Sequence, residues 1–217
     1  MSAVPILLQR VEDLDPQLVR EDTAFKPWFQ EDDLLIHIQS QQTEWRRSSS
    51  FQEMQATFNS ANFPAKVTKV IGFGLGSCAI GDSIHRTWTC PIQHDLLVLL
   101  RELLCEKGKT IQCISQDPEY NETEKSIYGR QGIQVLEDPS GFLEVDDESI
   151  VITIAASAPV RAIVMDLAMP AAMVWMNGYA PLAPYAALGL TIMMQDIAHG
   201  PTSGLDPRKV ETALHLR

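Results

Sequence analysis

Residues 66–77, KVTKVIGFGLGS, are the stretch of sequence that decides the fold. Lys66–Phe73 is β-branched and apolar, as is typical of a strand, and it runs directly into Gly74-Leu75-Gly76-Ser77. A strand that ends in a glycine-rich turn is typical of the first strand of an open α/β sheet, because glycine allows a sharp turn and a close approach of the backbone to a ligand. This stretch therefore predicts an α/β domain that begins at about residue 66.

Segments of alternating strand and helix character follow this turn. We predict strands over 110–115, 133–136, 150–155 and 188–194, and helices over 94–104, over 121–129 and from about residue 160. Ile150–Ala155 is apolar apart from Thr153, which is expected of a parallel strand that is buried on both faces. The predicted fold class is α/β, a three-layer Rossmann-like open parallel sheet, in which ligands bind beyond the carboxyl ends of the strands.

Residues 1–65 are predicted to form an N-terminal helical arm, and residues 66–217 the Rossmann-like domain. Apolar residues recur at helical spacing over Glu31–Ser40 and again over Ser50–Phe58. The polar run Gln39–Ser50 between them predicts an exposed connection. The arm is therefore expected to contain two helices joined by a loop.

The composition limits the classes of partner. The chain has 217 residues, of which 28 are acidic and 17 basic, so its formal net charge is −11. This charge gives no general attraction for nucleic acid or an anionic membrane, and contact with RNA requires a local basic patch. No run reaches the roughly 18 uncharged apolar residues of a membrane-spanning helix, and the four cysteines match no zinc or redox spacing. We therefore expect a cytoplasmic protein without a membrane segment or a bound metal.

The glycine-rich turn partly matches loops that bind dinucleotide phosphates. Gly74, Gly76 and Ala79 fit the pattern G-x-G-x-x-G/A, and Asp117 follows the second strand, where an acid that binds a ribose is expected. Asp117 comes 43 residues after Gly74 instead of about 20, because residues 81–91 separate the glycines from the long helix. A loop without a helix N-terminus directly behind it binds phosphate weakly, so the pattern fits a bare tight turn better.

Ser77 is a second candidate in this turn, because its hydroxyl is expected to be exposed between free backbone N–H groups. This arrangement suits a nucleophile with an oxyanion site beside it. The alternative is a serine that caps the turn. Ser83, His85 and Arg86 lie in the next segment, which is predicted to be either a lid over the loop or an exposed loop without a role. The spacing of the histidines does not select one of them as a base for Ser77.

Carboxylates cluster after the predicted strand 110–115, at Asp117, Glu119, Glu122 and Glu124. Because the carboxyl end of a parallel strand faces the ligand crevice, one or two of these side chains are expected to face a ligand. They are suited to bind a cationic group, or to act as acid and base where burial raises a pKa.

Three parts of the chain resemble the sensitivity-to-red-light-reduced family, in its fungal form, over roughly residues 66–195. They are Val70–Ser77 with its Gly-Leu-Gly-Ser turn, the leucine-rich segment Gln93–Leu104, and Asp117-Pro118-Glu119-Tyr120 with Glu124. One departure lies at Met193–Asp196, where family members carry a Gly-Asn-Ser type of turn. Plant and yeast members are regulatory proteins of light signalling, the clock or the cytoskeleton, whereas some fungal proteins similar to this domain are arginine-containing cyclodipeptide synthases.

The resemblance to the cyclodipeptide synthases implies an aminoacyltransferase of fungal secondary metabolism. Such an enzyme takes aminoacyl-tRNA as substrate and forms an arginine-containing diketopiperazine without a cofactor. Ser77 is then the acyl acceptor, Asp117 and Glu119 hold a guanidinium or amine, and the Gly74–Gly76 backbone stabilises the oxyanion.

Further contacts with the substrate are also predicted. The residues that would make them are Ser83, His85, Arg86 and Glu124. Contact with tRNA would rely on a basic strip made of Arg46, Arg47, Lys66, Lys69 and Arg86. Two alternatives stay open: a non-catalytic regulatory or ligand-binding protein, and a nucleotide- or S-adenosylmethionine-dependent Rossmann enzyme.

Overall fold

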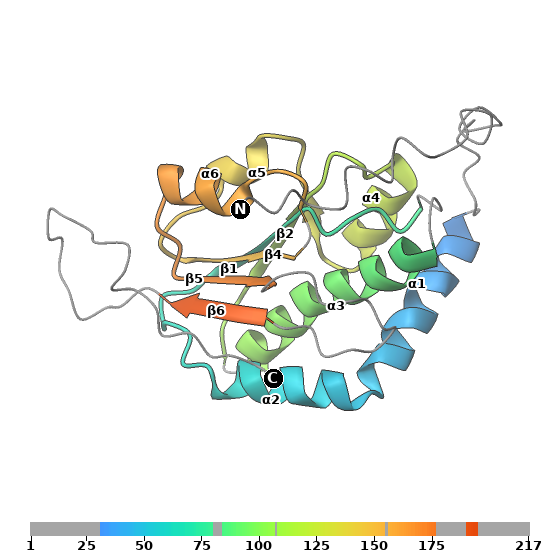
Figure 1. The fold of residues 1–217 in the computed structure, drawn as a ribbon, viewed down its shortest axis with the longest axis horizontal. Coiled ribbons are helices and arrows are strands. Elements are labelled where there is room, and N and C mark those ends of the chain that lie inside the picture. The colour runs from blue at the N-terminus through green and yellow to red at the C-terminus, as the bar shows by residue number, and fades with distance from the viewer. Residues whose placement is uncertain (1–30, 80–83, 107, 155, 177–189, 195–217) are drawn as a thin grey trace, which may run out of the picture.

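The computed structural model describes residues 31–79, 84–106, 108–154, 156–176 and 190–194, and for residues 84–89, 176 and 190–194 it gives the backbone alone. A six-stranded sheet lies at the centre (Figure 1). Its strands are β1 Lys69–Phe73, β2 Gln112–Gln116, β3 Gln134–Val135, β4 Ser149–Thr153, β5 Ala172–Met176 and β6 Leu190–Met194. The first five strands are parallel and β6 is antiparallel to β5.

The strand order is β3-β2-β1-β4-β5-β6. β2 and β3 therefore lie on one side of β1, and β4, β5 and β6 lie on the other. Phe73 at the end of β1 is in register with Gln116 of β2 and Thr153 of β4, so these three strands end at the same level. The predicted Rossmann-like open sheet is confirmed, with an antiparallel strand at one edge.

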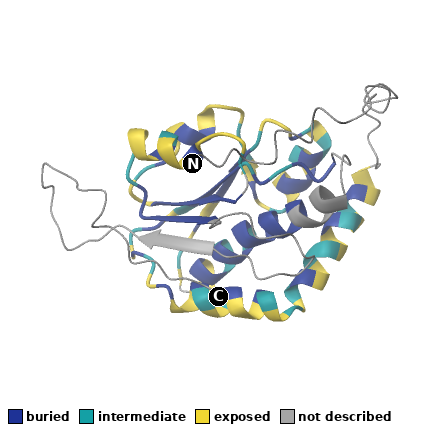
Figure 2. Ribbon diagram, in the orientation of Figure 1, coloured by how far each residue is buried: buried dark blue, intermediate teal, exposed yellow. Residues whose placement is uncertain are grey.

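Helices cover both faces of the sheet and complete three layers. The helices are α1 Glu31–Arg46, α2 Ser49–Ser60, α3 Ile84–Glu106, α4 Glu122–Arg130, α5 Ser140–Leu143 and α6 Val160–Leu167. In Figure 1, α5 and α6 lie on one side of the sheet, and α1, α2 and α3 on the other. Successive strand side chains enter opposite cores: Val70 packs in the cluster of α1 to α4, and Ile71 in the cluster of α5 and α6. Figure 2 shows the central strands buried and the outer helix surfaces exposed.

The two predicted helices of the N-terminal arm are present, but the loop predicted between them is wrong. α1 continues to Arg46 because Leu34, Ile38 and Trp45 lie on one buried face, so packing against α3 extends the helix through the polar run. Ser48 caps α2, since its hydroxyl accepts a hydrogen bond from the backbone N–H of Phe51. Both helices share the core of the sheet's first face.

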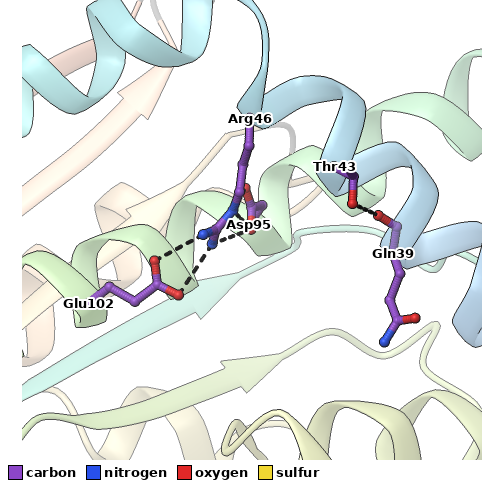
Figure 3. Close-up of polar contacts among 5 residues, drawn as sticks. All are labelled: Gln39, Thr43, Arg46, Asp95 and Glu102. Carbon is purple, nitrogen blue, oxygen red and sulfur yellow. Dashed lines mark hydrogen bonds and ion pairs between the residues drawn. The ribbon is translucent and has the colours of Figure 1, made fainter.

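Arg46 ties α1 to α3 through two carboxylates (Figure 3). Its guanidinium donates to Asp95 from Nε and Nη2 at 2.8–3.0 Å, and from Nη1 to Glu102 at 3.1 Å. Asp95 is buried on α3, with 3% of its side chain exposed, whereas Glu102 is exposed by 42%. Burial raises the pKa of Asp95 and the guanidinium beside it lowers that pKa in part.

Two further elements differ from the sequence-based expectation. α3 begins at Ile84, ten residues before the predicted start, and runs through Pro91. β5 was not predicted, because the apolar run after residue 160 was assigned to one helix. α6 instead ends at Leu167, and Ala172–Met176 forms a strand with Met173 in the core. No helix in the described part of the chain is long and apolar enough to span a bilayer.

A candidate ligand-binding crevice

A cavity of about 290 Å³ opens at the carboxyl ends of β1, β2 and β4. It lies where the strand order reverses around β1, which is the usual ligand position in open α/β sheets. Its described lining comprises Phe73, Gly74, Gly76, Cys90, Gln93, Gln116, Asp117, Pro118, Glu119, Asp138, Phe142, Ala156, Ser157, Ala158 and Val160. We take this crevice as the candidate functional site.

The glycines after β1 are required by the geometry of the turn. Gly74 and Gly76 have φ angles of +62° and +81°, which other residues rarely adopt. A Cβ atom on Gly74 would lie 2.4 Å from Cβ and 2.7 Å from Cα of Ala156. The loop after β1 can therefore touch the segment after β4 only because residue 74 has no side chain.

Replacing Gly74 with alanine is expected to lower the free energy of unfolding by about 2 kcal/mol, since strain in φ adds to overlap with backbone atoms. Gly108→Ala is the matched control, because Gly108 has φ +80° but nothing within 4 Å of an added Cβ atom. Strain alone should cost about 1 kcal/mol there. Urea denaturation of both variants measures the difference, and equal losses would contradict the close contact with Ala156.

The loop directs its backbone donors to the protein's own acceptors. The N–H of Gly74 donates to the Gln116 carbonyl at 3.0 Å, and that of Gly76 donates to Oδ2 of Asp117 at 2.8 Å. The N–H groups of Cys78 and Ala79 donate to Oε1 of Glu124 at 2.6 and 3.3 Å. Two carboxylates therefore occupy the backbone donors that a nucleotide phosphate would need. The loop is poorly suited to bind a phosphate for this reason.

Ser77 is not exposed, so the prediction of an accessible nucleophile is wrong. Its side chain is fully buried, and its hydroxyl donates to Oε2 of Glu124 at 2.7 Å. The Oγ of Ser77 also accepts the N–H of Ala79 at 3.1 Å. The alternative reading, a serine that caps the turn, fits this geometry, because the loop folds inward against α4 instead of presenting Ser77 to the crevice.

Glu124 lies behind the loop and does not line the cavity as described, so the structure gives no support to a contact with substrate. It is the third residue of α4, and it forms a capping box with Asn121. The Asn121 side chain accepts the N–H of Glu124, and Oε2 of Glu124 accepts the N–H of Asn121. Burial raises the pKa of Glu124, while the hydrogen bonds from Ser77, Asn121, Cys78 and Ala79 oppose this change.

Asp117 and Glu119 line the crevice together. Asp117 is held by two backbone donors, the N–H of Gly76 on Oδ2 and the N–H of Glu119 on Oδ1 at 2.9 Å. The 43-residue interval from Gly74 therefore does not separate Asp117 from the glycine loop, because the long helix α3 accommodates it.

Asp138 is a third carboxylate of the crevice, and it was not predicted from the sequence. Gln116 orients it: Nε2 donates to Oδ1 of Asp138 at 2.8 Å, while Oε1 accepts the N–H of Gly141 at 2.6 Å. The signal was the position of Asp138-Pro139 after the predicted strand 133–136, at the same sheet edge as Asp117. No lysine or arginine is present among the described residues that line the cavity.

Aromatic and small residues complete the crevice. Phe73 at the end of β1 stacks on Phe142 of α5, with ring centroids 4.4 Å apart and planes at 15°. Ala156–Ala158, which precede α6, form another part of the wall. These residues were not predicted from the sequence either, although small residues after an apolar strand are a usable sign of the ligand edge.

The lid predicted over the loop lies largely outside the described residues. Ser83 is outside them, and His85 and Arg86 are described as backbone in the first turn of α3. The expectation that the long helix begins far from the glycines is wrong, because α3 begins eight residues after Gly76. Most of the segment 81–91, which was expected to separate the glycines from the long helix, belongs to α3.

His94 of α3 is fully buried and is not a base for Ser77. Its Nδ1–H donates to the Cys90 carbonyl at 2.7 Å, so Nε2 of the neutral ring accepts the hydroxyl proton of Tyr120 at 2.7 Å. Tyr128 stacks on the ring at 4.3 Å. Burial lowers the pKa of His94 to about 4. His94 is therefore a neutral part of the core.

Three of the five residues of the basic strip expected to contact tRNA are paired with acids: Arg46, Lys66 and Lys69. Arg46 binds Asp95 and Glu102. Lys66 lies 2.6 Å from Asp147, and Lys69 lies 2.7 Å from Asp146. These acids offset the charge of the three residues, and contact with tRNA stays a prediction. In the described part of the chain, no three His, Cys, Asp or Glu side chains are grouped as metal ligands.

Comparison with known proteins gives one match. A protein-family model described as the SRR1 domain matches residues 41–176, which include β1 to β5, the glycine loop and all the described residues of the crevice. No curated protein and no solved structure matches the chain.

Proposed function

Because the chain belongs to the SRR1 domain family, whose match covers every described residue of the crevice, we propose that this crevice binds a small group that is cationic and carries no phosphate. The observation that carries the proposal is the charge of the lining. Asp117, Glu119 and Asp138 line a cavity to which the described residues contribute no lysine or arginine. The ligand that we propose is the guanidinium of an arginyl group.

The carboxylates are suited to a planar, forked cation. Asp117 is oriented by the N–H groups of Gly76 and Glu119, and Asp138 by Gln116, so their positions are set before a ligand arrives. A guanidinium forms paired, charge-assisted hydrogen bonds with carboxylates. Phe73 and Phe142 add aromatic surface to the same cavity, and a guanidinium also binds favourably over an aromatic ring.

Aminoacyl transfer to form an arginine-containing diketopiperazine is the finer function within this proposal. The acidic crevice supports recognition of an arginyl group. The burial of Ser77 argues against this residue as the acyl acceptor, because an aminoacyl ester cannot reach its hydroxyl while Glu124 and the loop enclose it. The transfer would need another acceptor. A regulatory protein that binds such a group without changing it uses the same recognition.

A specific observation favours one second candidate, S-adenosylmethionine. Asp117 lies at the glycine loop and follows β2, where an acid that binds ribose hydroxyls is expected in Rossmann-like sheets. S-Adenosylmethionine carries a ribose and a positive charge but no phosphate. It therefore agrees with the acidic lining and with a loop whose donors are occupied.

Binding measurements by calorimetry separate these ligands. We expect arginine methyl ester to bind more tightly than citrulline methyl ester, which has the same shape and α-amine but a neutral urea group. Glu119→Gln and Asp138→Asn should each weaken binding about tenfold, which corresponds to one charge-assisted hydrogen bond of about 1.4 kcal/mol. Glu122→Gln is the control, because Glu122 is an exposed carboxylate nearby that does not line the described cavity.

Equal affinity for the two esters would contradict guanidinium recognition. Binding of S-adenosylmethionine, weakened by Asp117→Asn, would establish the second candidate instead. Tight binding of NAD would contradict both, since its phosphates require free loop donors. Mass spectrometry of extracts from cells that express the chain then tests the finer function, by a search for arginine-containing cyclic dipeptides.

A further inference from the structure

The side chain of Glu124 accepts hydrogen bonds from donors of the glycine-rich loop that, in other proteins, bind an anionic ligand. Its Oε1 accepts the N–H groups of Cys78 and Ala79, and its Oε2 accepts the hydroxyl of Ser77. Successive backbone N–H groups and a hydroxyl that converge on one point form a cradle for an anion. Here the cradle belongs to the loop after β1, and the anion comes from α4, more than 40 residues further along the chain.

No cation balances this carboxylate among the groups described around it. Three neighbouring groups interact electrostatically with Glu124, and none of them is basic: Cys78 of the loop, Tyr120 before α4 and Tyr128 of α4. From α3, the neighbouring groups Cys90 and His94 face Cys78, Tyr120 and Tyr128. His94 is neutral in the hydrogen-bonded arrangement described above. The hydrogen-bond donors of the loop and of the α4 cap therefore hold the buried carboxylate, without a salt bridge.

The cradle also shapes the crevice. Gly74 and Gly76 are part of the cavity wall, and the chain directly after them is tied to Glu124. Asp117 holds the same loop from the crevice side through the N–H of Gly76. The loop thus lies between two carboxylates, one that faces the ligand space and one that is fully buried.

We propose that Glu124 is the resident anion of this loop, and that removal of its carboxylate exposes an anion-binding site that a small carboxylate from solution can fill. Glu124 is then a positioning residue: it sets the path of the crevice wall and touches no ligand. The inference rests on the hydrogen bonds of the loop and does not depend on which ligand enters the crevice.

Chemical rescue of Glu124→Ala tests this proposal. Alanine keeps Cβ, and the atoms removed correspond to acetate. The variant loses the acceptor of four donors, and we expect its Tm to fall by about 5–10 °C. Acetate at high concentration should restore a large part of that loss. Acetamide, which has the same shape without the charge, and sodium chloride at equal ionic strength should not.

Two variants serve as controls. Glu122→Ala removes an exposed carboxylate from the same helical turn, and its Tm should be insensitive to acetate. Glu124→Gln keeps the space filled, but its amide NH2 group replaces one of the two accepting oxygens. In either orientation this group faces a backbone N–H donor, that of Asn121 or those of Cys78 and Ala79. It should lose stability and gain nothing from acetate, because no cavity is left for it.

Specific outcomes would overturn the proposal. A Glu124→Ala protein that responds equally to acetate and acetamide would show that only the filled volume matters. A folded Glu124→Ala protein without an acetate response would show that the cradle does not bind anions. If Glu124→Ala does not fold in buffer, refolding from urea in acetate must recover native protein where acetamide does not, and failure to do so equally rejects the proposal.

Discussion

Arg46→Ala is expected to lower the free energy of unfolding by about 3 kcal/mol, because it leaves the buried carboxylate of Asp95 without its partner. Three hydrogen bonds from the guanidinium to Asp95 are lost, and α1 loses its polar link to α3. We place the effect at the lower end of the range for buried ion pairs, since the Arg46 side chain is 35% exposed. Urea denaturation at pH 7 measures it.

The two partner residues provide the controls for this prediction. Glu102→Gln should change the free energy of unfolding by less than about 0.5 kcal/mol, because Glu102 is half-exposed and such pairs contribute little. Arg46→Met combined with Asp95→Leu should recover most of the loss, since a matched apolar pair leaves no buried charge.

The deficit of Arg46→Ala should also depend on pH. Burial already raises the pKa of Asp95, and loss of the guanidinium raises it further. A raised carboxyl pKa means that stability falls as pH rises through the folded-state pKa, so the deficit should be largest at neutral pH and smaller in acid. A deficit that is the same at pH 5 and pH 7, or a stable single variant, would contradict a critical role for the pair.

His94 is expected to make the protein lose roughly 3 kcal/mol of stability between pH 6.5 and pH 4. Burial lowers its pKa from 6.5 to about 4, so in this interval the unfolded chain binds a proton that the folded chain does not. The contribution of His94 is complete above pH 6.5 and is lost as pH falls through the folded-state pKa. Protonation of Nε2 would also remove the acceptor of the hydrogen bond that the Tyr120 hydroxyl donates.

The comparison of wild type with His94→Gln isolates this contribution. Other titrating groups are common to both proteins, so they cancel in the difference between the two curves of unfolding free energy against pH. The curves should approach each other by roughly 3 kcal/mol as pH falls from 6.5 to 4, whatever the offset at neutral pH. Parallel curves would show that His94 gains a proton as readily in the folded protein as in the unfolded chain.

Local sequence patterns were sufficient for most of the sheet. β2 and β4 were predicted within two residues and β1 within three, because apolar, β-branched runs bounded by turns are typical of buried strands. The same signal failed for β5, whose five residues follow closely on an apolar helix. The start of α3 was also missed, because the leucine-rich pattern covers only residues 94–104, whereas the helix begins at Ile84 and continues through Pro91.

The sequence by itself determined that Gly74 and Gly76 end a first strand and that Asp117 follows the second one, since both facts depend on neighbouring residues. Only the tertiary structure decided what these groups touch. Ser77 turns inward because α4 brings Glu124 against the loop, and Asp138 reaches the crevice because β3 packs beside β2. These contacts join residues 47 and 22 positions apart, as in Ser77–Glu124 and Gln116–Asp138. The direction of a side chain at such a distance depends on the packing of whole elements, which no local pattern of residues contains.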